Sequence, residues 1–190
     1  MSPLANTVTY ILSFGTLVLN FGLAILIVAI FFDKRAQKKG KKLHASYDHL
    51  KRNALLFGLI STIVATVGSL FYSQIVNLPP CSLCWIQRVL LFPQIIILGF
   101  AMYYESHKAV RLSAILAVLG IMFAGYHAYL QYGWGASSLL CSLLGEISCS
   151  QRYFLEFGYI TMPIMSLTIF VLLLLLTTYI HIPKSKDPQI

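Results

Sequence analysis

The sequence has few charged residues, and very few of them are acidic. Charged side chains make up 11% of the 190 residues, with six Asp and Glu against 14 Lys and Arg. A soluble globular domain carries roughly 25% charged residues. The sequence also has no internal repeat and no low-complexity segment. These shortages argue against an ordinary soluble domain and against a repeat architecture.

The sequence has no basic stripe on a soluble domain, so its net charge of +8 does not indicate nucleic-acid binding. Eight of the 14 Lys and Arg fall within residues 34–52, in one short connector between apolar segments. Such clusters hold a connector on the cytoplasmic side of a membrane. The alternative for this connector is a docking site for anionic lipids or for a protein.

Long hydrophobic runs fill most of the chain, since 58% of the residues are hydrophobic. A helix needs about 20 apolar residues to cross the hydrocarbon core. Five segments meet this length, at residues 8–32, 53–75, 85–104, 112–132 and 158–181. The first is too long for the apolar region of a signal peptide and lacks a small-residue cleavage site, so we expect a retained helix. The fold class predicted is all-α and integral to the membrane, with five transmembrane helices.

Orientation follows from the basic residues. If the spans alternate, the connectors around residues 34–52 and 105–111 and the tail at 182–190 share one side, which the positive charge makes cytoplasmic. The N-terminus is then outside and the C-terminus inside. The same alternation places all four cysteines on the outer side, where an oxidising compartment allows disulfides to form.

The four cysteines form two pairs, Cys81 with Cys84 and Cys141 with Cys149. None lies deep within an apolar segment, where free structural cysteines are more often found. Two pairs on one side are compatible with a two-dithiol relay, with two structural disulfides or with a four-cysteine zinc site. A helix that begins near Cys84 would favour its thiolate, because unpaired N–H groups and the helix dipole stabilise negative charge.

Three polar residues flank the first pair at the outer end of predicted spans. Arg88 lies four residues after Cys84, on the same helical face, and provides a fixed positive charge. The alternative for Arg88 is an interfacial side chain that snorkels to water. His127 and Gln131 share one face of the fourth span and suit a hydrogen bond to a polar head group. Their alternative is a hydrogen bond between helices.

The second span also carries a stripe of small residues, for which we expect a role in helix packing. The stripe is formed by Gly58, Thr62, Ala65 and Ser69.

Two motifs and the order of the cysteine pairs resemble the DsbB family of disulfide bond formation proteins, including the shorter BdbC-type forms of Gram-positive bacteria. The motifs are CSLCWIQR at residues 81–88 and GYHAYLQYG at 125–133, followed by the second pair before the last span. The resemblance covers about residues 53–181. Vitamin K epoxide reductase relatives place their C-x-x-C after the loop cysteines. In this sequence the C-x-x-C comes first, which argues against membership of that family.

The resemblance implies a redox relay with the reversible disulfides Cys81–Cys84 and Cys141–Cys149. A thioredoxin-like thiol oxidase of the DsbA type would form a mixed disulfide with Cys141. Cys149 would exchange with Cys81, and Cys84 would face a membrane quinone as a thiolate. Arg88 would stabilise the charge that develops on the quinone, which is ubiquinone or menaquinone. His127 resembles a family histidine near the quinone, and Gln131, Trp85 and Gln87 are further candidate quinone contacts.

The function implied is a membrane thiol:quinone oxidoreductase that supports disulfide formation in the bacterial inner membrane. Its rivals are a vitamin K epoxide reductase-like enzyme and a membrane scaffold with structural disulfides or zinc. The expected organisation is an extra helix and basic connector at residues 1–52, a four-helix oxidase domain at 53–181 and a tail at 182–190. We expect the loop at 133–157 to hold a short amphipathic helix on the outer membrane face.

Overall fold

The computed structural model describes five parts of the chain. They are residues 3–37, 45–104, 106–133, 149 and 152–179. Most of the loop at 133–157, which is predicted to hold a short amphipathic helix, lies outside these residues, and so does Cys141.

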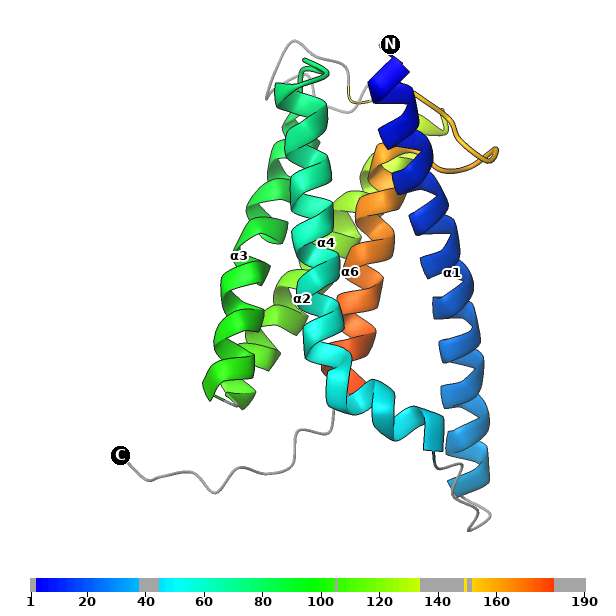
Figure 1. The fold of residues 1–190 in the computed structure, drawn as a ribbon, viewed down its shortest axis with the longest axis vertical. Coiled ribbons are helices and arrows are strands. Elements are labelled where there is room, and N and C mark those ends of the chain that lie inside the picture. Colours follow the sequence, from blue (N-terminus) through cyan, green and yellow to red (C-terminus); the bar gives the residue numbers. More distant parts are fainter. Residues whose placement is uncertain (1–2, 38–44, 105, 134–148, 150–151, 180–190) are drawn as a thin grey trace.

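The regular elements of the described residues are five α-helices (Figure 1). These are α1 (Pro3–Gln37), α2 (Ala45–Gln74), α3 (Ser82–Tyr104), α4 (His107–Gln131) and α6 (Met162–Tyr179). The prediction of an all-helical fold is confirmed.

Four of the helices contain stretches long and apolar enough to cross a membrane. These stretches are Pro3–Ala29, Asn53–Gln74, Ser82–Tyr104 and His107–Gln131. The apolar stretch of the fifth helix, Met162–Thr178, is shorter. The sequence predicted this span from residue 158, but Glu156 and Ile160 form an isolated β-bridge there, and the helix begins only at Met162.

Helices α2, α3, α4 and α6 form a closed bundle, in which α4 packs on α3 and α6, and α2 packs on the same two helices. Helix α1 lies outside this ring and contacts mainly α6 (Figure 1). The expectation of a four-helix core with an extra N-terminal helix is therefore confirmed. A closed ring of four helices lets each helix bury one face against two neighbours.

Polar and close contacts hold the bundle together inside the membrane. Ser113 Oγ of α4 donates to Gln94 Oε1 of α3 at 2.6 Å, and Gln94 Nε2 donates to the Ser113 carbonyl at 3.1 Å. Both side chains are fully buried, so each satisfies the other where no water is present. On the opposite seam, Gly120 of α4 lies against the Phe170 ring of α6, with no room for a Cβ.

Helix α1 docks through a narrow stripe of small and polar residues. The buried members are Ala5, Thr9, Ser13, Thr16 and Leu23. Tyr72 Oη of α2 donates to Thr9 Oγ1 at 3.0 Å, and Thr168 Oγ1 of α6 donates to Asn20 Oδ1 at 2.9 Å. Small side chains allow close approach in lipid, where packing and hydrogen bonds drive association. The rest of α1 exposes large apolar side chains, as expected of a lipid-facing helix.

The ends of several helices meet at one end of the molecule. The start of α1, the end of α2, the start of α3, the end of α4 and the start of α6 lie together there (upper end in Figure 1). This connectivity places Cys81 and Cys84 at that end, next to the segment that follows Cys149.

Candidate active site

The connection from α2 to α3 is a rigid turn that sets the position of the first cysteine. Asn77 has a φ of 56°, a left-handed conformation that Asn tolerates at the end of a helix. The Leu78 N–H donates to the Tyr72 carbonyl at 3.0 Å, which closes the last turn of α2. Pro79 and Pro80 then restrict the chain as it enters α3.

Cys81 stands at the N-terminus of α3, where its carbonyl accepts the first helical hydrogen bond, from the Trp85 N–H at 3.1 Å. The Cys81 and Cys84 sulfurs are 3.0 Å apart, and both are free thiols. Cys81 is buried and Cys84 is partly buried. The pair is therefore a dithiol already in position to close.

The surroundings of Cys81 favour its thiolate. The hydrogen bond with Cys84 lowers the pKa of Cys81 to about 4, although burial opposes this, and a hydrogen bond with His127 lowers it further. The sequence argument placed the thiolate at Cys84. In this dithiol state the structure favours Cys81, because its sulfur lies at the helix start and accepts the hydrogen bonds of its neighbours.

His127 connects the dithiol to the interior of the bundle. Its Nε2 lies 3.7 Å from Cys81 Sγ, and its Nδ1 lies 2.9 Å from Gln87 Nε2. An amide nitrogen can only donate, so Nδ1 accepts and a neutral imidazole carries its proton on Nε2. His127 therefore presents an N–H to the sulfur of Cys81, and Gln87 fixes the tautomer.

Arg88 is held against α2 and does not snorkel to water. Its side chain is only 8% exposed. Its Nε donates to Ser69 Oγ at 2.9 Å and its Nη2 to the Ser69 carbonyl at 2.8 Å. Its Cζ lies 5.4 Å from the Trp85 ring centroid. Within the part of the chain described here, Nη1 has no acceptor, so it remains available to a ligand.

A cavity of about 600 Å³ lies beside these side chains, between α1, α2, α3 and α6. We call Cys84, Gln87, Arg88 and His127, which all line it, the polar end. The other lining residues are mostly apolar. This volume and this combination of an apolar wall with a few converging polar groups are typical of small-molecule sites.

The cavity unites most of the residues predicted to bind a cofactor, but not all of them. Gln87, Arg88 and His127 line it, whereas Gln131 and Trp85 do not. Gln131 is buried in α4 one turn beyond His127, and Trp85 is 55% exposed. Sequence reasoning missed Ser69 as the partner of Arg88, because its place in a small-residue stripe indicated packing alone. It also missed Tyr153, which lines the cavity.

Cys149 lies close to the first pair. It is 3% exposed and belongs to one cluster of packed side chains with Cys81, Leu83 and Leu130, with Cys84 at its margin. Cys149 is disulfide-bonded. The pairing Cys141–Cys149 stays a prediction, because Cys141 lies outside the described residues.

The segment after Cys149 is anchored to the same end of the bundle. Tyr153 Oη donates to the Pro79 carbonyl at 3.2 Å, and the Phe154 ring stacks on Tyr72 with centroids 5.6 Å apart. The segment that follows Cys149 is thus attached to the end of α2 and to the turn that carries the first cysteine pair.

Comparison with known proteins agrees with this arrangement. The profile of the family described as "Disulfide bond formation protein DsbB" matches residues 51–180. The chain belongs to the DsbB family. The match includes α3, α4, α6 and all four cysteines, and it excludes α1.

Several curated disulfide formation proteins are also similar to this chain. A probable disulfide formation protein of Chlamydia caviae is 39% identical over 117 residues, which cover 62% of this chain and 83% of the relative. One from Coxiella burnetii is 36% identical over 120 residues, covering 62% and 80%. Disulfide bond formation protein C of Bacillus subtilis is 31% identical over 138 residues, covering 71% and 99%. No solved structure matches the chain.

Proposed function

We propose that this protein is a thiol:quinone oxidoreductase that converts the dithiol of a DsbA-type thiol oxidase to a disulfide and a membrane quinone to a quinol. Membership of the DsbB family by itself supports a membrane protein that takes part in disulfide bond formation. The observation that carries the finer proposal is the cavity, whose polar end joins a dithiol to a buried cation. Two electrons and two protons leave the partner and reach the quinone, so the conversion balances.

The cavity fits a quinone by the chemistry of its donors. A quinone has two carbonyl acceptors on a ring that takes up negative charge on reduction, and it supplies a two-electron acceptor when bound. Arg88 holds a permanent charge and a free Nη1 donor at the polar end, where low dielectric strengthens its effect. The apolar remainder of the cavity suits the rest of such a molecule. The sequence and the fit are equally compatible with ubiquinone and menaquinone.

The order of the sulfur exchanges is proposed from the family resemblance, and the packing of Cys149 beside Cys81 supports it. The partner would form its mixed disulfide with Cys141, which leaves Cys149 as a thiolate. The packing of Cys149 in the cluster of Cys81 supports attack of Cys149 on Cys81, with Cys84 as the departing sulfur of the first pair. The partner's second thiol then attacks the mixed disulfide, which oxidises the partner and frees Cys141 as a thiolate. Attack of Cys141 on Cys149 re-forms the second pair and releases Cys81 as the leaving thiolate. A low pKa makes a better leaving group, and the pKa of Cys81 is lowered to about 4.

His127 and Gln87 hold a hydrogen-bond donor beside the sulfur atom of Cys81 during this exchange. The His127 Nε2–H can hydrogen-bond to the Cys81 thiolate as it forms, and Gln87 keeps that tautomer in place. These two residues therefore serve the dithiol as well as the cavity.

A zinc site is the rival suggested by the geometry, because the ligand atoms of Cys81, Cys84 and His127 all lie within 4.8 Å of one another. Two thiolates on tetrahedral zinc, with Zn–S of about 2.3 Å, would place their sulfurs about 3.8 Å apart. The observed separation is 3.0 Å. This separation lies between the zinc value and the S–S bond of about 2.05 Å, so the distance does not choose between the two. We favour the redox function because the chain belongs to a family of disulfide bond formation.

The proposed setting is the bacterial inner membrane, with the cysteines on the outer face. The basic connector at residues 34–52 supports this orientation by the positive-inside rule. The N-terminus would be outside and the C-terminus cytoplasmic. A thioredoxin-like partner would then reach the cysteines from the outer compartment.

The test uses purified, fully reduced and metal-free protein in detergent, to which a short-chain quinone is added. Quinone absorbance and free thiols are followed together in wild type and in Cys84→Ser. We expect quinone loss with a matching loss of thiols in wild type only. Persistence of both thiols and quinone in wild type would contradict the proposal. Stoichiometric zinc binding by that same protein, lost in His127→Ala, would then establish the rival.

A further inference from the structure

The cavity has a second end, formed by α1 and α2, that the chemistry above does not use. Six large apolar side chains line it and are also at least 40% exposed. We call them the apolar mouth: Ile11, Phe14 and Val18 of α1, and Phe57, Ile60 and Val64 of α2. Side chains that line a cavity and are also exposed on a transmembrane helix mark an opening toward the lipid.

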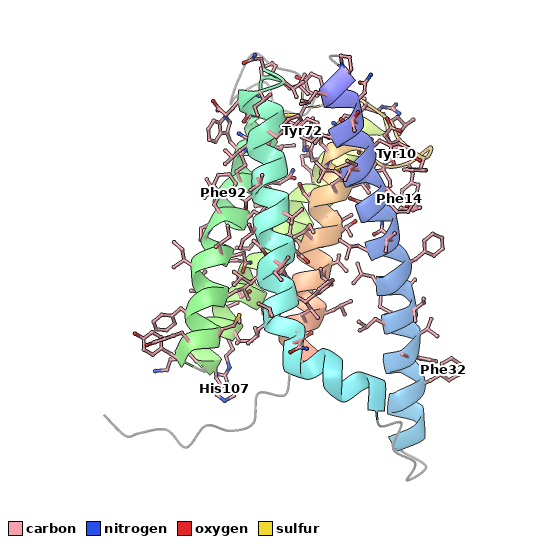
Figure 2. The ribbon with its side chains drawn as sticks, in the orientation of Figure 1. Tyr10, Phe14, Phe32, Tyr72, Phe92 and His107 are labelled. Carbon is pink, nitrogen blue, oxygen red and sulfur yellow. The ribbon has the colours of Figure 1, made fainter. Side chains whose placement is uncertain are left out.

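Helices α1 and α2 touch above this mouth and diverge below it. The Tyr72–Thr9 hydrogen bond joins them near the end that carries the cysteines. One turn deeper, a Cβ at Gly68 would lie 3.1 Å from Leu12 Cδ1, so the Leu12 side chain packs against α2 there. Below this contact the two helices separate, and the first turns of α2 run back toward α1 at the lower end (Figure 1). Phe14, which lines the cavity, lies on the upper half of α1 (Figure 2). The opening is therefore lateral, between two helices that are fixed to each other at one end.

We propose that this mouth holds the polyprenyl tail of the quinone, so that α1 completes the binding site of this chain. The inference rests on the proposed function. The polar end carries hydrogen-bond donors that suit the carbonyl groups of a quinone ring, whereas the mouth is apolar and exposed. Both ends line one cavity. A quinone kept in the bilayer by its tail would enter between α1 and α2 with its ring leading toward Cys84 and Arg88.

Helix α1, which lies outside the region matched by the DsbB family, acquires a role if it forms part of the binding site for the quinone tail. The family profile matches residues 51–180, so α1 lies outside it. Without α1, the cavity would lose one of its walls and lie open along α2 and α6. Helix α1 is fixed to both of these helices through Thr9 and Asn20, which suits a wall better than a loosely attached anchor.

Two glycines of α1 provide a matched test. No atom lies within 4 Å of a Cβ built at Gly15 or at Gly22, so a larger residue fits at either. Both are exposed, but only Gly15 lines the cavity. Gly15→Leu thus places a side chain in the mouth, and Gly22→Leu places the same side chain in lipid seven residues further along the helix.

The experiment measures equilibrium binding of two probes to oxidised protein in lipid nanodiscs, by quenching of tryptophan fluorescence. The probes are a dimethoxy-methyl-benzoquinone without a tail and the same ring with a decyl tail. Gly15→Leu should weaken binding of the tailed probe about tenfold or more, as expected when a side chain occupies the space of a ligand. Its affinity for the tail-less probe should change less than about twofold, and Gly22→Leu should leave both affinities within that range.

A second readout does not depend on the variants folding. A decyl quinone with a diazirine at the end of its tail is photolysed on wild-type protein, and labelled peptides are identified by mass spectrometry. Label on residues 11–18 and 57–64 supports the inference. Label confined to α4 or α6, or equal effects of the two leucine variants, overturns it while the proposed function stands. Failure of wild type to bind either probe, and also the corresponding methyl-naphthoquinones with and without a tail, overturns the proposed function as well.

Discussion

The two ends of the cavity are built from different kinds of side chain. The polar end comes from α3 and α4, where Gln87, Arg88 and His127 are each less than 10% exposed and hydrogen-bonded. The apolar mouth comes from α1 and α2, whose lining side chains are largely exposed. The polar end requires particular atoms at particular distances. The mouth requires only shape and apolarity, so many sequences satisfy it.

The largest effect should follow from removing the cation of the polar end. We expect Arg88→Gln to slow quinone reduction by the reduced protein about 10²-fold to 10³-fold, as when one preorganised donor to a developing anion is lost. Arg88→Lys should recover part of the rate, because it keeps the charge without the two bonds to Ser69. The rate is read from quinone absorbance in stopped flow.

Arg152→Gln is the matched control for this prediction. Arg152 lies over the Tyr132 ring, with its Cζ 5.9 Å from the centroid, and it does not line the cavity. Its loss should leave the rate within about twofold, since an exposed cation contributes little. A rate for Arg88→Gln above half of wild type would contradict the role of Arg88.

The bundle that supports the polar end should be sensitive at its closest approach. A Cβ in Gly120→Ala would overlap the Phe170 ring, so we expect a loss of about 1–3 kcal/mol in the free energy of unfolding. Gly125→Ala on the same helix meets no atom within 4 Å and should be neutral or slightly stabilising. Thermal unfolding in detergent, followed by circular dichroism, compares the two. Equal midpoints would show that α4 and α6 are not in close contact at Gly120.

The thiolate at Cys81 should determine how the alkylation of this cysteine depends on pH. Because the pKa of Cys81 is lowered to about 4, alkylation of Cys81 by iodoacetamide should stay nearly constant from pH 8 to about 5 and fall only below that. An ordinary cysteine, with a pKa of about 8.5, loses reactivity throughout this range. Mass spectrometry of the reduced protein reads the site specifically.

Two variants rank the causes of this low pKa. Cys84→Ala removes the largest cause, the hydrogen bond from Cys84, and should shift the profile toward higher pH the most. His127→Ala removes a smaller cause and should shift it less. A Cys81 profile that rises steadily between pH 6 and 9 in wild type would place the thiolate elsewhere.

The smallest effect should come from the attachment of α1. Tyr72→Phe removes the hydrogen bond to Thr9 and should cost about 0.6 kcal/mol, the average for such bonds between transmembrane helices. Tyr103→Phe is the control, because Tyr103 is 79% exposed and, in the described residues, its hydroxyl makes no hydrogen bond. Unfolding in mixed detergent micelles measures both. A loss above about 2 kcal/mol would show that α1 belongs to the core.

Much of the fold and part of the candidate site could be predicted from the sequence, because membrane spans and short motifs are local features of a chain. Apolar length gave the helices, and the i and i+4 spacing placed Arg88 beside Cys84. The resemblance to the DsbB family, carried by CSLCWIQR and GYHAYLQYG, is confirmed by the family match. Gln131 and Trp85 were proposed on the same local grounds, yet they do not line the cavity, because side-chain direction depends on neighbouring helices.

The sequence by itself determined the helical class and most of the apolar spans, and it provided the candidate reactive residues, whose roles stay a prediction. Only the tertiary structure decided that Ser69 holds Arg88, that Gln87 fixes the His127 tautomer, and that Cys149 packs with Cys81. It also decided that α1 forms one wall of the cavity. The physical reason is that in lipid every apolar face is equally compatible with a neighbour or with acyl chains. Which faces meet is set by a few small residues and interhelical hydrogen bonds, whose partners lie 19 to 148 residues apart in the sequence.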